Sequence, residues 1–218
     1  MNVKELVYVF LRKSLIGQDV DFKNSNSVLQ GCISLAYDDM MTAGRFVSKG
    51  RWAKDNLLDS FSSVLEKHGF AFSRSLIDDC LPLFGIEEKI IVNGKIKNGK
   101  SKKGKPFTKE ATRFGLSQKL VNMSFKYFLV FSDLLSSHHI KFENLDCPID
   151  SIILKSIYGE NGKDKKIIWS KISKEEYFSC QATIKDILSK DSNVSGNMEL
   201  KALGNIVYDF EEWGRTND

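Results

Sequence analysis

The chain has 218 residues, of which 42% are hydrophobic and 28% are charged, and its formal net charge at pH 7 is +4. This is the composition of an ordinary soluble globular protein, and no uncharged stretch is long enough to cross a membrane. The N-terminal residues carry no secretory signal, so a cytoplasmic protein without membrane attachment is expected.

The first half of the chain has the hydrophobic spacing of helices. Apolar residues recur three or four positions apart, which places them on one helix face, in the segments 3–15, 27–46, 56–67 and 72–84. Gly69 and Gly85 follow the last two segments and predict their ends. Residues 89–92 carry the first of two weak strand signals, and the second lies at 166–169.

A basic segment separates the two halves. Residues 92–110 contain seven lysines and one acidic residue, and three glycines with Pro106 predict a flexible loop. Lysines along a flexible chain bind a phosphate backbone in a salt-dependent way. The candidate DNA contacts in this loop are Lys100, Lys102, Lys103 and Lys105. The same composition also fits a solvated surface loop without a partner.

Helices are predicted through most of the second half as well. The predicted segments are 109–114, 117–135, 150–157, 173–188 and 198–213. Gly115 ends the first of these as a left-handed helix stop, Asp150 is a strong N-cap, and Ser173 with Glu176 forms a capping box. The chain is therefore expected to have a mainly α fold.

The Gly115 turn between two helices predicts a helix-hairpin-helix motif. The helix after such a turn presents free backbone N–H groups and the positive end of its dipole, which together bind a phosphate without reading the base sequence. The candidate DNA-backbone contacts at this turn are Arg113, Gly115, Ser117 and Gln118.

Lys119 and Asp150 are the candidate catalytic residues. Lys119 lies in the first turns of the predicted helix 117–135, and Asp150 follows 31 residues later at the start of another helix. A lysine amine that is partly neutral can attack a sugar C1′ and form a Schiff base. A fixed carboxylate can stabilise the positive charge that develops there. A surface lysine and a plain helix cap explain the same two residues equally well.

Together these segments resemble the helix-hairpin-helix (HhH-GPD) DNA glycosylase superfamily, in particular the 8-oxoguanine type with AP lyase activity. Gly115-Leu116-Ser117-Gln118-Lys119 is similar to the family's Gly-hydrophobic-Gly-x-Lys hairpin, and Pro148-Ile149-Asp150 is similar to its hydrophobic-Asp step. The resemblance covers residues 108–156. Ser117 replaces the family's second glycine, and the spacing from Lys119 to Asp150 is longer than usual, which implies an insertion at 131–146.

The resemblance implies a two-lobed helical glycosylase fold. Its parts are a helical lobe at 1–90, the basic loop at 91–107, the hairpin and catalytic Asp region at 108–160, and C-terminal helices at 161–218. It further implies that Lys119 is the Schiff-base nucleophile and Asp150 the assisting carboxylate. The implied partner is double-stranded DNA, from which a monomeric enzyme flips the target base.

The implied target is a damaged or modified base. A role in DNA repair and a role in defence against foreign DNA would both use the same residues, so the sequence favours neither. Candidate base-pocket residues are Trp52, Phe114 and Trp169, although most aromatic residues of a helical protein pack in its core. No cofactor and no metal is expected, because the cysteines at 32, 80, 147 and 180 are too scattered for zinc or an iron–sulfur cluster. Two alternatives remain: a non-catalytic helix-hairpin-helix DNA-binding module, and a helical protein-interaction domain.

Overall fold

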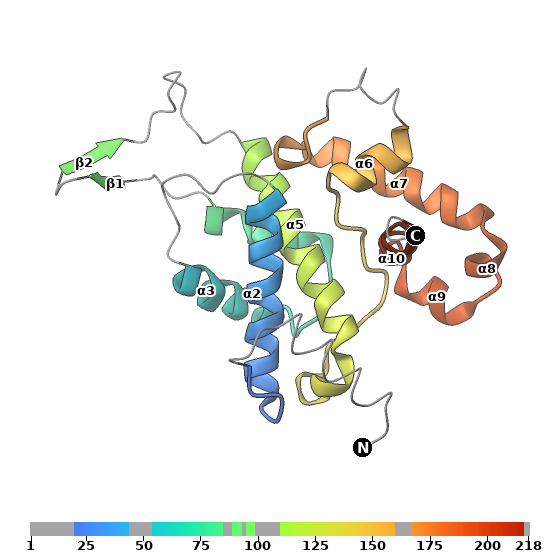
Figure 1. Cartoon of the computed structure of the whole chain (residues 1–218), viewed down its shortest axis with the longest axis horizontal. Coiled ribbons are helices and arrows are strands. Elements are labelled where there is room, and N and C mark those ends of the chain that lie inside the picture. The colour runs from blue at the N-terminus through green and yellow to red at the C-terminus, as the bar shows by residue number, and fades with distance from the viewer. Residues whose placement is uncertain are drawn as a thin grey trace.

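The computed structural model describes residues 20–43, 54–84, 89–92, 95–98, 110–159 and 167–215. These residues form a mainly helical fold, as the sequence predicts (Figure 1). The α-helices are α2 (Ser25–Ala43), α3 (Lys54–Lys67), α4 (Arg74–Asp79), α5 (Glu110–Val130), α6 (Ser151–Tyr158), α7 (Lys174–Lys190), α8 (Ser192–Ser195), α9 (Met198–Leu203) and α10 (Ile206–Arg215). The helix predicted at 3–15 lies outside the described residues.

Short 3-10 turns connect several of these helices: η1 (Leu81–Phe84), η2 (Ser132–Leu134), η3 (Ser136–His138) and η5 (Trp169–Lys171). None of the described helices is both long enough and apolar enough to span a membrane.

Helix α5 runs through the middle of the fold. Helix α2 lies along one side of it, and α6, α7 and α10 lie on the other side (Figure 1). Every residue from 114 to 126 is buried, as is typical of a helix that protein encloses on all sides. Six of these residues are polar: Ser117, Gln118, Lys119, Asn122, Ser124 and Lys126. Buried polar groups need partners, so these side chains influence how other segments dock against α5.

The chain does not turn at Gly115. Helix α5 continues through this residue, and Gly115 is not among the positive-φ residues of the described chain. A Cβ at this position would lie 2.5 Å from the carbonyl oxygen of Trp169 and 2.7 Å from the carbonyl carbon of Ser170. The predicted hairpin is therefore wrong. Glycine permits a turn and a close contact equally well, and here the chain at 169–170 needs the close contact.

Gly115→Ala is expected to destabilise the fold by about 1–3 kcal/mol, although alanine is the better helix former. The added methyl group would meet backbone atoms of residues 169 and 170, which cannot move aside as a flexible side chain can. Urea unfolding of the variant measures the effect. A gain in stability, the usual result for a glycine in an uncrowded helix, would contradict this close approach.

Two predicted caps are confirmed. The Asp150 side chain caps α6, and Ser173 with Glu176 forms a capping box at the start of α7. Other predicted helices differ in their ends. The segment 72–84 consists of α4 and η1, and the segment 198–213 is broken into α9 and α10 at Gly204, whose φ is +82°. The helix predicted at 117–135 ends at Val130, before η2 and η3.

One predicted strand is confirmed. Strand β1 (Lys89–Val92) pairs antiparallel with β2 (Lys95–Asn98), which lies within the segment predicted as a flexible loop. The strand predicted at 166–169 is wrong for its described residues, since Trp169 begins η5. The four candidate DNA-binding lysines, Lys100, Lys102, Lys103 and Lys105, lie outside the described residues, as does Trp52.

Candidate active site

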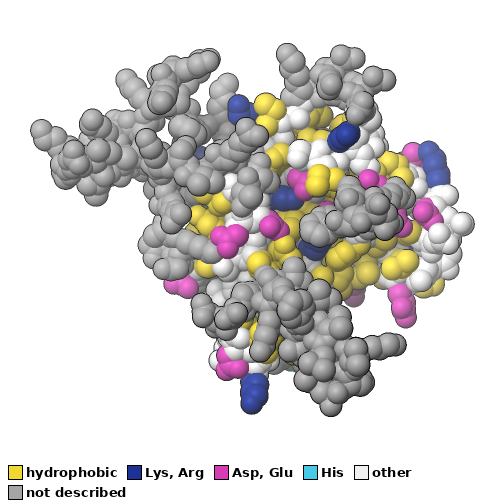
Figure 2. Space-filling view, in the orientation of Figure 1, with side chains coloured by type: hydrophobic (Ala, Val, Ile, Leu, Met, Phe, Trp, Pro, Cys, Tyr) yellow, Lys and Arg dark blue, Asp and Glu magenta, His cyan; other side chains and the backbone are white. Residues whose placement is uncertain are grey.

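Lys119 and Asp150 are in contact. The Lys119 Nζ lies 2.8 Å from the Asp150 Oδ2, and the two side chains are 4% and 16% exposed. Figure 2 shows basic and acidic side chains beside one another within a largely hydrophobic surface in the region of α5 and α6. The pair that the sequence predicts from two segments 31 residues apart therefore exists in the structure.

The start of α6 holds the Asp150 carboxylate in a fixed orientation. Its Oδ1 accepts hydrogen bonds from the backbone N–H groups of Ile152 and Ile153, both at 2.9 Å, which leaves Oδ2 to face Lys119. Burial raises the pKa of the Asp150 carboxyl, but the Lys119 ammonium and the two N–H groups outweigh burial and lower the pKa below its ordinary value. Asp150 is therefore a carboxylate anion at neutral pH.

The extended chain before Asp150 is held by Gln118. The Gln118 side-chain NH₂ donates to the Ile149 carbonyl at 2.9 Å, and its amide oxygen accepts from the Ile149 N–H at 3.1 Å. The Gln118 side chain thus pairs with both the N–H and the carbonyl of Ile149, as a residue of a neighbouring antiparallel strand does. Because Gln118 precedes Lys119 and Ile149 precedes Asp150, this double contact sets the register between the two candidate catalytic residues.

A second glutamine holds the same extended segment from α7. Gln181 donates to the Cys147 carbonyl at 2.7 Å and accepts from the Cys147 N–H at 3.0 Å. The Asn205 side chain, 2.9 Å away, donates to both the backbone oxygen and the side-chain oxygen of Gln181. The extended chain at 147–149 is therefore hydrogen-bonded by side chains of two helices, α5 and α7.

Asp146 anchors the beginning of this segment. It accepts two hydrogen bonds from the Arg74 guanidinium, at 2.8 and 2.9 Å, and one from the Tyr177 hydroxyl at 3.0 Å. The Asn122 side chain donates to the Tyr177 oxygen at 2.9 Å and to the Gln118 oxygen at 3.3 Å. One continuous network thus links Arg74 on α4 to Gln118, the residue next to Lys119.

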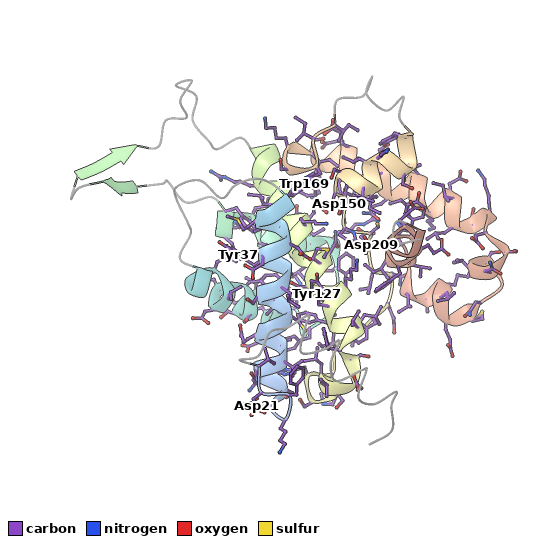
Figure 3. All side chains as sticks on the ribbon, in the orientation of Figure 1. Asp21, Tyr37, Tyr127, Asp150, Trp169 and Asp209 are labelled. Atoms are coloured by element: carbon purple, nitrogen blue, oxygen red, sulfur yellow. The ribbon has the colours of Figure 1, made fainter. Side chains whose placement is uncertain are left out.

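A second buried ion pair, between Lys126 and Asp209, lies beside the first. Their side chains are 8% and 3% exposed. Figure 3 shows Asp150 and Asp209 near each other beside α5. Burial raises the pKa of the Asp209 carboxyl, although Lys126 and Lys119 act in the opposite direction. The sequence indicates the position of Lys126 in this pair, because Lys119 and Lys126 are seven residues apart and share a helix face. It does not indicate that Asp209 is the partner of Lys126.

Cys147 lies among these four charged residues. Burial raises the pKa of its thiol, and the charges of Asp209 and Asp150 raise it further, while Lys119 and Lys126 lower it. The thiol is fully buried, so it remains protonated and is not a nucleophile at neutral pH.

The residues predicted to bind the DNA backbone at the hairpin all lie within α5, and the side chains of two of them have partners inside the protein. Ser117 is buried and its hydroxyl donates to the Ile77 carbonyl, and the Gln118 amide is occupied by Ile149. Their backbone N–H groups belong to the interior of α5, as does that of Gly115. Arg113 is partly buried in the same helix. These four residues therefore do not form a phosphate-binding turn, because no helix begins there.

Two of the predicted base-pocket residues belong to the core. The Phe114 ring packs edge-on against Tyr177 at 5.5 Å between ring centres. Phe114 is 4% exposed and Trp169 is 5% exposed. With both rings enclosed by protein, the prediction that they stack on a flipped base is wrong for this conformation.

Among the residues that the structure describes, no group of His, Cys, Asp and Glu side chains is arranged to hold a metal ion. No protein-family model matches this chain, and no match is found among curated proteins or among solved structures. The resemblance to the DNA glycosylases therefore rests on the residues around Lys119 and Asp150.

Proposed function

We propose that this protein is a DNA glycosylase with AP lyase activity, in which Lys119 is the nucleophile and Asp150 the assisting carboxylate. The observation that carries the proposal is the 2.8 Å contact between the Lys119 amine and an Asp150 carboxylate that two backbone N–H groups orient. An amine and a carboxylate held together by largely buried side chains are suited to Schiff-base chemistry.

The reaction uses the two side chains in different roles. In the ion pair with Asp150, Lys119 is an ammonium, so it must first give a proton to water. The free amine then forms a bond to C1′ of the target nucleotide as the bond from C1′ to the base breaks. The electron pair of that bond leaves with the base, which takes up a proton. The positive charge that builds up on the sugar lies beside Asp150, whose anionic form stabilises it. The attached nitrogen then loses a proton, and its electron pair forms the C1′=N bond of a Schiff base as the C1′–O4′ bond breaks and O4′ takes up a proton. Loss of a proton from C2′ of this Schiff base expels the 3′ phosphate.

The support for DNA as the substrate comes from two sources. The segment 92–110 carries seven lysines, a composition suited to phosphate backbones. The sequences around Lys119 and Pro148-Ile149-Asp150 resemble those of DNA glycosylases. The continuous helix α5 removes the hairpin, on which a non-catalytic helix-hairpin-helix module depends entirely and the resemblance to the glycosylases depends in part. The Lys119–Asp150 pair therefore favours the enzyme over that alternative.

Borohydride trapping tests the proposed chemistry. The protein is incubated with duplexes that carry an abasic site or an oxidised, alkylated, deaminated or hypermodified base, and borohydride then reduces any Schiff base to a stable adduct. We expect an adduct with the abasic site and with at least one of the modified bases. The absence of an adduct with every duplex would overturn the proposal.

Lys119→Gln is expected to abolish the adduct and to leave duplex binding largely intact. Lys174→Gln is the matched control, because the Lys174 Nζ also pairs with a carboxylate, that of Asp78 at 2.7 Å, but at the exposed surface. This control should give the wild-type yield of adduct. If the adduct persists in Lys119→Gln, another amine is the nucleophile and the role of Lys119 is wrong.

A further inference from the structure

A cavity of about 220 Å³ lies among α7, α8 and α9, at the right of Figure 1, and its lining includes neither Lys119 nor Asp150. The apolar side chains in the lining are Leu188, Val194 and Leu200, of which the first two are buried. Pockets for drug-sized ligands measure roughly 300–1,000 Å³. This cavity is smaller, so it suits a smaller molecule that has an apolar part.

The turn between α9 and α10 forms one wall of the cavity together with Asn144. Gly204 in this turn has a φ of +82°, and a Cβ there would lie 2.9 Å from the Asn144 Cα. The N–H of Asn144 donates to the Ala202 carbonyl at 2.9 Å, and the N–H of Leu145 donates to the Leu203 carbonyl at 2.8 Å. Backbone hydrogen bonds thus hold this wall in place without a ligand.

Three cationic side chains line the same cavity: Arg74, Lys185 and Lys201. Its lining contains no carboxylate from the described residues. Asp146 binds the Nε and one Nη of Arg74, and the other Nη has no hydrogen-bond partner in the described chain. Neither lysine pairs with a carboxylate in the part of the chain that the structure describes. The charge around the cavity is therefore positive, which favours an anion.

We propose that this cavity binds a small organic anion, which has a phosphate or carboxylate group beside one apolar ring or short chain. The acid group accepts charge-assisted hydrogen bonds from Arg74 and the two lysines. The apolar part packs against the leucine and valine side chains of the lining. A neutral molecule of the same shape leaves the three cations unpaired, so charge decides the specificity. This binding is independent of the proposed DNA chemistry.

Titration calorimetry with four probes tests the proposal: phenyl phosphate, benzoate, benzyl alcohol and inorganic phosphate. We expect at least one of the two aromatic anions to bind, and benzyl alcohol to bind about tenfold more weakly or not at all. The tighter of the two anions identifies the acid group. The proposal is overturned if neither aromatic anion binds, or if benzyl alcohol or inorganic phosphate binds as tightly as they do.

Substitutions of the lining locate the binding. Lys185→Gln/Lys201→Gln should weaken the aromatic anion about tenfold and leave the urea midpoint unchanged, because neither lysine has an ion-pair partner among the described residues. Ser195→Trp should abolish binding by filling the cavity while every charge is kept. Lys190→Gln is the matched control, since Lys190 is also on α7 but pairs with Asp186 at 2.6 Å outside the lining. Wild-type affinity in the double variant, or an equal loss in the control, would overturn the site.

Discussion

Asp150→Asn is expected to lower the free energy of unfolding by about 3–5 kcal/mol at pH 7, because it leaves the buried Lys119 ammonium without its partner. Asparagine keeps an oxygen for the N–H groups of Ile152 and Ile153, so the helix cap is largely retained. Urea unfolding measures the loss. Asp78→Asn is the matched control, because Asp78 pairs with Lys174 at the surface, where such a pair contributes about 1 kcal/mol or less.

The cost of Asp150→Asn should depend on pH. Burial raises the pKa of the Asp150 carboxyl, but Lys119 and the backbone N–H groups lower it below its value in the unfolded chain, which is about 4. The charged carboxylate therefore stabilises the fold above that pH, and this stabilisation is lost as the pH falls through the pKa of the folded state. Wild type and variant should differ most at neutral pH and converge in acid. A pH-independent difference would show that the charge of Asp150 is not the cause.

Gln118→Leu is expected to destabilise the protein by about 2–6 kcal/mol, since it leaves the buried N–H and carbonyl of Ile149 without partners, at about 1–3 kcal/mol each. Leucine has a similar size, so little of the effect comes from a cavity. Gln30→Leu is the matched control, because Gln30 donates one hydrogen bond, to Ser62, at a partly buried position. Urea unfolding of both variants gives the comparison.

The same substitution should also disturb the candidate site. Gln118 sets the register of Ile149, and the next residue, Asp150, must face Lys119. We expect faster amide exchange at Ile149 and a lower yield of trapped adduct in Gln118→Leu, with the Gln30 variant unchanged in both. Exchange at the wild-type rate would show that Gln118 is not required to hold this segment.

Much of the helical architecture could be predicted from local sequence. Hydrophobic spacing predicts α3 and α7 closely, and side-chain caps predict the starts of α6 and α7, because both signals act within a few residues. Gly115 shows where local reasoning fails. The same residue permits a helix stop and a close contact, and the backbone at 169–170 that decides between them lies more than fifty residues away.

The contact between Lys119 and Asp150 was predicted from two short segments, but its surroundings were not. The sequence suggests Gln118 as a DNA contact, whereas in the structure it holds Ile149 inside the protein. Asp209 carries no local signal, because its partner Lys126 comes from a different helix. Residues whose partners are distant in sequence are indistinguishable from surface residues until the chain folds.

The sequence by itself determined the helical class of this protein, two of its caps and the identity of its candidate amine and carboxylate. These follow from periodicity and from residue chemistry, which are local properties. The tertiary structure decided that α5 is continuous, that two glutamines hold the chain before Asp150, and that a second lysine and aspartate join the first pair. The physical reason is burial: enclosed polar side chains need partners, and Ser117, Gln118, Lys119 and Lys126 find theirs in distant parts of the chain.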